Sequence, residues 1–197
     1  MRNILLEIKA LTNFIGFFRT FFYVVKCCVI KIMYYNSFWI YCFTDKNVPS
    51  YNVTSLEGEV CIAEKIEDVV WRSVFGPLTL RTFQKRFALG DRCFFFLYEG
   101  KPIHYSWVSF AESRLLRLKR GDAYLYNAYT HPHFRGHNIH SSFVEKRINF
   151  AYEAGAANVY IGVAKCNHAA IGVLEKKFKL RKRGSVRLLR LLGKSIA

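Results

Sequence analysis

Residues 122–178 read DAYLYNAYTHPHFRGHNIHSSFVEKRINFAYEAGAANVYIGVAKCNHAAIGVLEKKF, and this stretch decides the fold. Its patterning predicts a strand, a loop, a helix, a second strand and a second helix, in the ranges 122–130, 131–140, 141–152, 158–164 and 167–178. Pro132 ends the first strand because proline cannot donate to a hydrogen-bonded ladder. Gly155 ends the first helix, as glycine does at many helix C-termini.

The loop between the first strand and the helix has the features of an anion site. A chain that leaves a strand and enters a helix presents unpaired backbone N–H groups, with the positive end of the helix dipole behind them. Gly136 allows the backbone to approach a ligand, and Asn138 tolerates left-handed dihedral angles better than other non-glycine residues. Arg135 adds a charge that pairs with phosphate. The loop therefore predicts a site for a phosphate or diphosphate.

These residues resemble the cofactor-binding core of the GNAT superfamily, the acyl-CoA-dependent N-acyltransferases. That family has a hydrophobic-x-Pro-x-aromatic step, similar to residues 130–134, followed by (Arg/Gln)-x-x-Gly-x-(Gly/Ala), similar to residues 135–140. Its next strand and its Asn-x-x-Ala element match residues 159–163, Asn167 and Ala170. The resemblance implies an α/β (α+β) fold with a mixed, mostly antiparallel sheet and helices on both faces.

The resemblance also implies a function and a set of site residues. The function is transfer of an acetyl group from acetyl-CoA to a primary amine, by direct attack in a ternary complex and without a metal. The residues expected to hold the pantetheine arm and the thioester oxygen are Ala128, Tyr129, Thr130 and Asn167. The residues expected to hold the diphosphate are Arg135, Gly136, His137, Asn138, Ile139, His140 and Ser141.

The sequence departs from the family pattern at four positions, which are Asn138, His140, Leu174 and Lys177. The family usually has glycine at the first and last of these positions, a small residue at the second, and often at the third a tyrosine that protonates the leaving thiolate. The candidates for proton transfer are therefore Tyr126, His131 and His168. A histidine suits this role because its pKa lies near ~6.5.

The rest of the chain is expected to form an extension, residues 1–35, and an acetyltransferase domain, residues 36–197. The extension predicts a basic amphipathic helix that either packs on protein or lies on an anionic membrane surface. Strands are expected at 36–44, 93–98, 103–110 and 185–192, helices at 64–75 and 79–89, and an irregular segment at 45–59.

Composition leaves several partners open. The net charge of +16 favours an anionic partner, which includes nucleotide cofactors, membranes and nucleic acid. The alternative function is therefore a nucleic-acid- or membrane-binding module on a non-catalytic GNAT fold. Four histidines, at 131, 133, 137 and 140, resemble a metal-binding tract but lack a recognised ligand spacing. None of the six cysteines forms a C-x-x-C pair and most lie in apolar runs, which indicates reduced thiols and a cytoplasmic protein, peripheral at the inner membrane face if the extension docks there. A homodimer and the identity of the amine remain open.

Overall fold

The computed structural model describes residues 33–44, 55–69, 77–111, 116, 118–191 and 194–196. The chain divides into two compact units, one of Phe38–Val186 and one that combines Met1–Ser37 with Arg187–Ala197. The first unit contains the strand, loop and helix segment 122–178, so the candidate site belongs to it. Among the described residues, no helix has both the length and the apolar run that crossing a membrane requires.

The described strands form one sheet of eight, in the order β2-β3-β4-β5-β6-β1-β7-β8. They are β1 Met33–Phe43, β2 Glu59–Ala63, β3 Arg92–Tyr98, β4 Lys101–Ser109, β5 Asp122–Thr130, β6 Asn158–Ala164, β7 Lys182–Leu191 and β8 Lys194–Ile196. The pairs β2–β3, β3–β4, β4–β5 and β1–β6 are antiparallel, whereas β5 and β6 are parallel. The expected mixed and mostly antiparallel sheet is confirmed.

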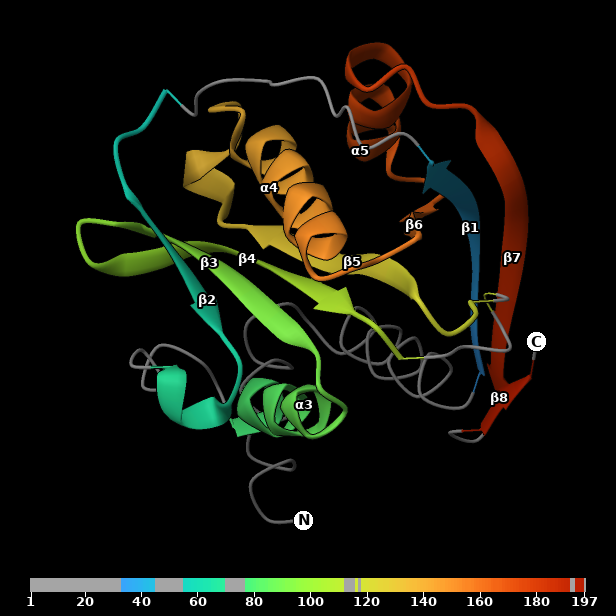
Figure 1. Cartoon of the computed structure of the whole chain (residues 1–197), viewed down its shortest axis with the longest axis horizontal. Helices are drawn as coiled ribbons and strands as arrows, with labels where there is room; N and C mark the ends of the chain where they lie inside the picture. Colours follow the sequence, from blue (N-terminus) through green and yellow to red (C-terminus); the bar gives the residue numbers. More distant parts are fainter. Residues whose placement is uncertain are drawn as a thin grey trace, which may run out of the picture. The chain divides into compact units, whose positions relative to one another are not determined.

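Helices cover both faces of this sheet within the first unit (Figure 1). Helix α4, Ile139–Glu153, crosses from β5 to β6 on one face, and α3, Pro77–Ala88, lies on the other. The shorter elements are η1 Ile66–Asp68, η3 Pro132–Phe134, α5 His168–Gly172 and the π-helix η4 Val173–Lys177. The parallel strands β5 and β6 need a crossover connection such as α4, because the second strand must start at the same edge of the sheet as the first.

The strand periodicity of two builds a separate core on each face. On β3, Phe94 and Phe96 face α4, while Phe95 faces α3. Phe143 on α4 and Phe83 on α3 are the matching anchors, each at most 1% exposed. This is why β3 reads as a continuous apolar run, since a strand that is covered on both sides has no polar face.

The structure corrects several expected boundaries. The strand β1 begins at Met33, so residues 33–35 belong to it and not to a helix, while the remainder of the expected N-terminal helix lies outside the described residues. Residues 59–63 form the edge strand β2, which the sequence did not predict. The expected helix at 64–75 is a 3-10 turn over Ile66–Asp68, and residues 70–76 lie outside the description. The strand expected at 185–192 begins earlier, at Lys182.

Candidate active site

The parallel strands β5 and β6 separate partway along their length. Their ladder runs from Asp122 opposite Asn158 to Leu125 opposite Ile161. Beyond that point β5 remains paired with β4 as far as Thr130, and β6 remains paired with β1 as far as Ala164. The described strands thus open into a wedge, and the last residues of β5 border it.

A bulge in β5 lies where the wedge opens. The register with β4 shifts between Tyr105 and Trp107, and Asn127 takes a left-handed conformation with φ 48°. When the Asn127 amide is oriented with its oxygen toward Arg86 on α3, this oxygen accepts hydrogen bonds from the two terminal guanidinium nitrogens, at 2.6 and 2.8 Å. A bulge bends its strand and redirects the residues that follow. The bulge therefore accounts for the direction in which 128–130 leave the β6 ladder.

The loop after β5 ends in a set of unpaired backbone donors. Pro132–Phe134 makes one 3-10 turn, Gly136 has φ 92°, and Asn138 precedes α4 with φ 58° and no side-chain cap. No backbone or side-chain oxygen of the described residues accepts from the N–H groups of residues 136–141. These donors and the N-terminus of the fifteen-residue helix α4 therefore create a positive electrostatic field.

A cavity of about 570 Å³ lies against these donors. Its walls come from the end of β5, from the loop and first turn of α4, and from α5 with η4. They consist of Ala128, Tyr129, Thr130, Phe134, Arg135, Gly136, Asn138, Ile139, His140, Ser141, Asn167, Ala169, Ala170, Val173 and Lys177. A cavity of this size, with apolar sides and one cationic, amide-rich wall, suits an elongated ligand that carries anionic groups.

Comparison with known families shows which family this chain belongs to. The sequence profile described as the acetyltransferase (GNAT) family matches residues 63–179, which is more than half of the chain. The chain belongs to the GNAT family. A search of curated proteins finds no match.

Solved structures share the GNAT fold with this chain at low sequence identity. A Drosophila protein from a structural genomics programme has a TM-score of 0.60 at 11% identity and covers 87% of this chain. A protein described as a GNAT-family acetyltransferase from Novosphingobium aromaticivorans has a TM-score of 0.56 at 16% identity over 78% of this chain. An acetyltransferase from the GNAT family of Colwellia psychrerythraea has 0.56 at 12% over 81%. The aligned region spans 57%, 62% and 57% of those three chains, respectively.

The cavity gathers all but one of the residues that the sequence analysis assigned to cofactor binding. The exception is His137, whose Nδ1 lies 2.8 Å from the hydroxyl oxygen of Ser55 and which does not line the cavity. Asn167 lines the cavity while its side-chain oxygen accepts from Ala170 N–H at 3.1 Å, which caps α5. That bond leaves the Asn167 amide nitrogen as a donor. The sequence analysis missed Phe134, Ala169, Val173 and Lys177 as lining residues, and omitted Ala170 although it quoted that residue in the motif.

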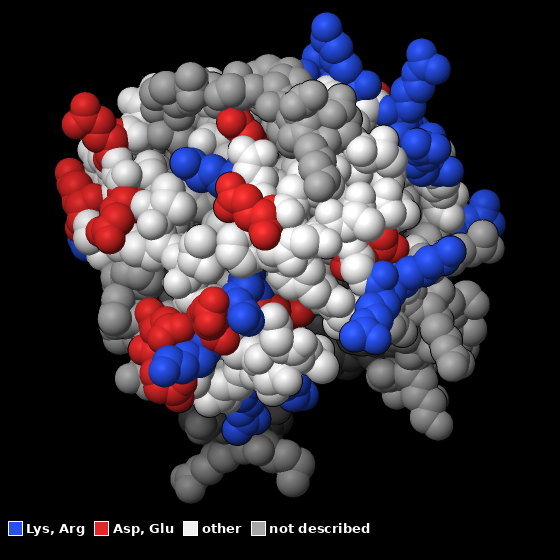
Figure 2. Space-filling view, in the orientation of Figure 1, with Lys and Arg blue, Asp and Glu red and all other residues white. Residues whose placement is uncertain are grey.

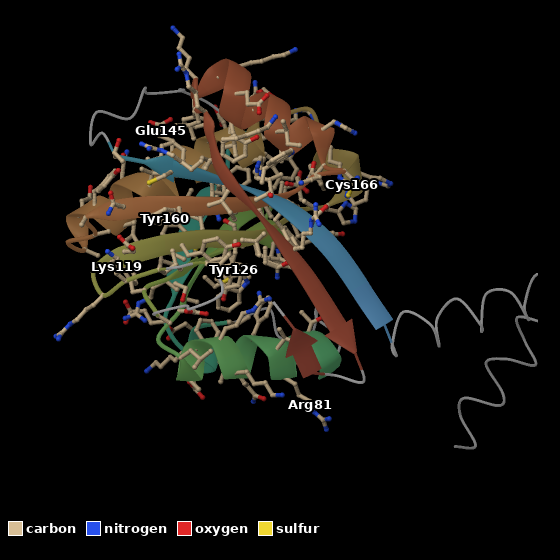
Figure 3. The ribbon with its side chains drawn as sticks, turned by 90° about the vertical axis from the view of Figure 1, so that its right-hand side faces the viewer. Arg81, Lys119, Tyr126, Glu145, Tyr160 and Cys166 are labelled. Carbon is tan, nitrogen blue, oxygen red and sulfur yellow. The ribbon has the colours of Figure 1, made fainter. Side chains whose placement is uncertain are left out.

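None of the three candidates for proton transfer lines the cavity. His131 and His168 are exposed. Tyr126 lies on the side of the sheet that faces α3 (Figure 3), and its hydroxyl donates a short hydrogen bond to Asp91. Burial, followed by the hydrogen bond and the charge of Asp91, raises the pKa of Tyr126 far above its ordinary value. Leu174, at the position where the GNAT family often has tyrosine, is fully buried in the core.

A polar cluster joins β4 to α4, in which His104 and Arg147 are buried and His140 is half-buried. The ring of His104 lies 2.8 Å from the Thr130 hydroxyl and 3.3 Å from that of Ser106, and its centroid is 6.4 Å from that of His140. Arg147 donates to the carbonyls of Phe143 and Trp107 at 3.0 and 3.2 Å. Burial lowers the pKa of both histidines, to about 4 for His140, and the positive charge of Arg147 lowers it further. Both imidazoles are therefore neutral near pH 7.

The four histidines of the loop region do not converge. Among the described residues, no three His, Cys, Asp or Glu side chains are placed to hold a metal ion. His131 and His133 contact each other edge to face, at 5.2 Å between ring centroids, while His137 and His140 point to different partners.

Proposed function

We propose that this GNAT chain is an N-acetyltransferase that transfers the acetyl group of acetyl-CoA to a primary amine. The observation that carries the proposal is the wedge between β5 and β6, with its cavity running to the unpaired N–H groups before α4. A nucleotide thioester has matching parts, because its diphosphate suits the amide-rich wall and its extended arm suits an unpaired strand edge.

The binding roles follow from the chemistry of each wall. The N–H groups of residues 136–141 and the guanidinium of Arg135 bind the diphosphate. Arg135 is held at the end of β5 by a bond from its Nε to the Thr130 carbonyl, at 3.3 Å. The backbone of 128–130 and the amide nitrogen of Asn167 bind the arm, and an N–H of β5 polarises the thioester carbonyl.

The reaction is direct attack. The neutral amine nitrogen bonds to the thioester carbon, the carbon–sulfur bond breaks, the nitrogen loses a proton, and the thiolate gains one. We propose that water carries both protons, because the hydroxyl of Tyr126 is engaged by Asp91 and because His131 and His168 lie outside the cavity. Catalysis then depends on positioning and carbonyl polarisation. Substitutions His131→Ala, His168→Ala and Tyr126→Phe should each lower kcat less than about tenfold, below the usual contribution of a general acid or base.

The first test is binding and turnover. Calorimetric titration of the full chain with acetyl-CoA should show saturable binding in the micromolar range and thermal stabilisation. The double variant Arg135→Ala/Asn138→Asp should lose both, since it removes one cation and adds one anion at the diphosphate wall. A screen of amino sugars, peptides and small amines should then release free thiol with one acceptor class. Binding without thiol release from any amine would support the non-catalytic module in place of the enzyme.

The localisation and the role of the N-terminal extension remain proposals from sequence. Residues 1–32 lie outside the described part of the chain. We propose a cytoplasmic protein whose extension docks on anionic lipid. Co-sedimentation with vesicles that contain phosphatidylserine should require residues 1–32, and recovery of the whole chain in the supernatant would contradict the docking.

A further inference from the structure

Lys177 is a basic side chain in the cavity wall, at a position where the family pattern has glycine. It is the last residue of the π-helix η4. Its neighbours Leu174 and Phe178 are anchored in the core, at 0% and 5% exposure. Because these anchors fix the turn, the lysine is directed along the surface of the cavity. Single π-helical turns occur often at functional sites.

The Lys177 ammonium is held by the loop that precedes α4. Its Nζ donates to Oδ1 of Asn138 at 2.9 Å and to the hydroxyl oxygen of Ser141 at 3.3 Å. Asn138 is itself a departure from the family pattern, and its side chain does not cap α4. Asn138 and Lys177, two positions at which the sequence departs from the family pattern, therefore contact each other although they lie 39 residues apart.

The charge of Lys177 is not neutralised by these contacts, because both acceptors are uncharged. Within the described ranges, ion pairs join Arg92 to Glu64 and Lys182 to Glu175, and no carboxylate pairs with Lys177. An ammonium has three N–H donors, and two are used. The third donor and the full charge remain at a wall that already holds Arg135 and the α4 N-terminus.

We propose that Lys177 binds the diphosphate of the nucleotide thioester, as a charged ligand that Asn138 and Ser141 hold in place. This inference rests on the proposed function and adds one contact to it. The amide donors of the loop supply only partial charges, and Lys177 supplies a whole one from a different element. The ligand thereby connects η4 to the first turn of α4.

The test compares Lys177→Met with Lys176→Met by calorimetry. Lys176 is the adjacent, exposed residue of the same π-helix and does not line the cavity, so its variant has the same change in net charge. We expect Lys177→Met to bind coenzyme A about tenfold more weakly than the wild type, the effect of one charge-assisted hydrogen bond. Lys176→Met should bind as the wild type does. Thermal unfolding of both variants without ligand checks that they fold.

Two further ligands locate the contact. Dephospho-coenzyme A keeps the diphosphate but lacks the 3′-phosphate, so it should show the same tenfold loss in Lys177→Met. Pantetheine lacks all phosphates and should bind both variants equally. Equal coenzyme A affinity in the two variants, a loss that disappears with dephospho-coenzyme A, or an equal loss with pantetheine would each overturn the inference. Failure of the wild type itself to bind coenzyme A would instead overturn the proposed function, and this inference with it.

Discussion

Gly162 on β6 lies under the ring of Tyr124, close to where the two parallel strands part. A Cβ added at Gly162 would collide with the Tyr124 hydroxyl oxygen, whereas the nearest ring atom, Cζ, would be 3.3 Å away. Tyr124 cannot yield freely, because its ring is stacked on Tyr126 at 5.6 Å between centroids. Overpacking of this kind typically costs about 1–3 kcal/mol, so Gly162→Ala should lower the free energy of unfolding by that amount.

The control for this prediction removes the colliding atom. Tyr124→Phe/Gly162→Ala leaves only the looser ring contact, so urea denaturation should show the double variant to be more stable than Gly162→Ala alone. If both were equally destabilised, the collision with the hydroxyl would not be the cause.

Two neutral histidines, His140 in the first turn of α4 and His104 on β4, predict a loss of stability in acid. Burial, and next the charge of Arg147, lower the pKa of His140 from its ordinary 6.5 to about 4. The unfolded chain therefore takes up a proton as the pH falls through 6.5, whereas the folded chain does not until about pH 4. The stabilisation is complete above pH 6.5 and is lost progressively below it. His104 shifts in the same direction and adds to the effect.

The measurement is the melting temperature at pH 7.5 and at pH 5. We expect the wild type to lose more stability over this interval than His140→Gln, which has no imidazole to titrate at that position. An equal fall in melting temperature for the two proteins would show that His140 does not contribute to the loss of stability in acid.

Single residues also show what sequence can predict. The left-handed conformation of Asn138 follows from its residue type and its place before a helix, and the structure has it at φ 58°. Its contact with Lys177 was not predictable, because side chains 39 residues apart meet only through the fold. The coupling of Tyr126 to Asp91, 35 residues apart, was hidden for the same reason.

At the scale of elements, the β5 bulge is the feature most closely tied to the site. Asn127 satisfies a left-handed backbone and also accepts from Arg86, whose guanidinium carbon lies 4.9 Å from the ring centroids of both Trp107 and Tyr126. Asn127→Ala removes the acceptor and disfavours the conformation, so it should destabilise the protein by about 1–2 kcal/mol. It should also raise KM for acetyl-CoA, because residues 128–130 would be less firmly placed.

Asn127→Gly is the matched control, since glycine accepts the same dihedral angles but also loses the bond to Arg86. It should fall between the wild type and Asn127→Ala in both chemical denaturation and KM. An Asn127→Gly variant as impaired as Asn127→Ala would assign the whole effect to Arg86 rather than to the backbone conformation.

Elements with a clear period were predictable and the others were not. The segment 158–164 alternates around apolar residues, and β6 occupies the range that was expected. The edge strand β2 escaped prediction because it is short, and its large residues Val60 and Ile62 are 38% and 45% exposed, so no buried face marks it. The division of the last helix into α5 and a π-helix also has no signal in the hydrophobic pattern of the sequence, since it depends on how Leu174 and Phe178 reach the core.

For the whole molecule, the distribution of charge matters more than its sum. Figure 2 shows Lys and Arg side chains gathered near α5 and β7, whereas Asp and Glu gather near β2 and the β3–β4 hairpin. Six of the eight residues from 176 to 183 are basic, and Lys177 among them lines the cavity. A field of one sign around a binding site attracts a ligand of the opposite sign from solution.

This asymmetry predicts that acetyl-CoA binding depends on salt. The Debye length falls from about 14 to about 6 Å between 50 and 300 mM salt, so Kd should rise at least about threefold over that range. Pantetheine has no phosphate and should bind equally at both concentrations. Identical salt responses for the two ligands, measured by calorimetry, would contradict a role for the basic surface.

The general architecture was predictable because several local signals agree. Residues 122–178 give the order of elements, the loop before α4 and the crossover, and together these determine a sheet in which β5 and β6 are parallel. No local sequence pattern encodes the opening between β5 and β6, because it results from β4 and β1 each holding one strand in place.

That opening places stability and activity in competition. From Tyr126 to Thr130, the side of β5 turned away from β4 has no β6 partner in the paired registers of the described strands. A longer β5–β6 ladder would close the opening and strengthen the fold, and it would also fill the space that we propose for the thioester arm. Laboratory selection for thermal stability alone should therefore favour variants in which β5 and β6 pair over a longer stretch. Such variants should have a higher melting temperature and no measurable turnover.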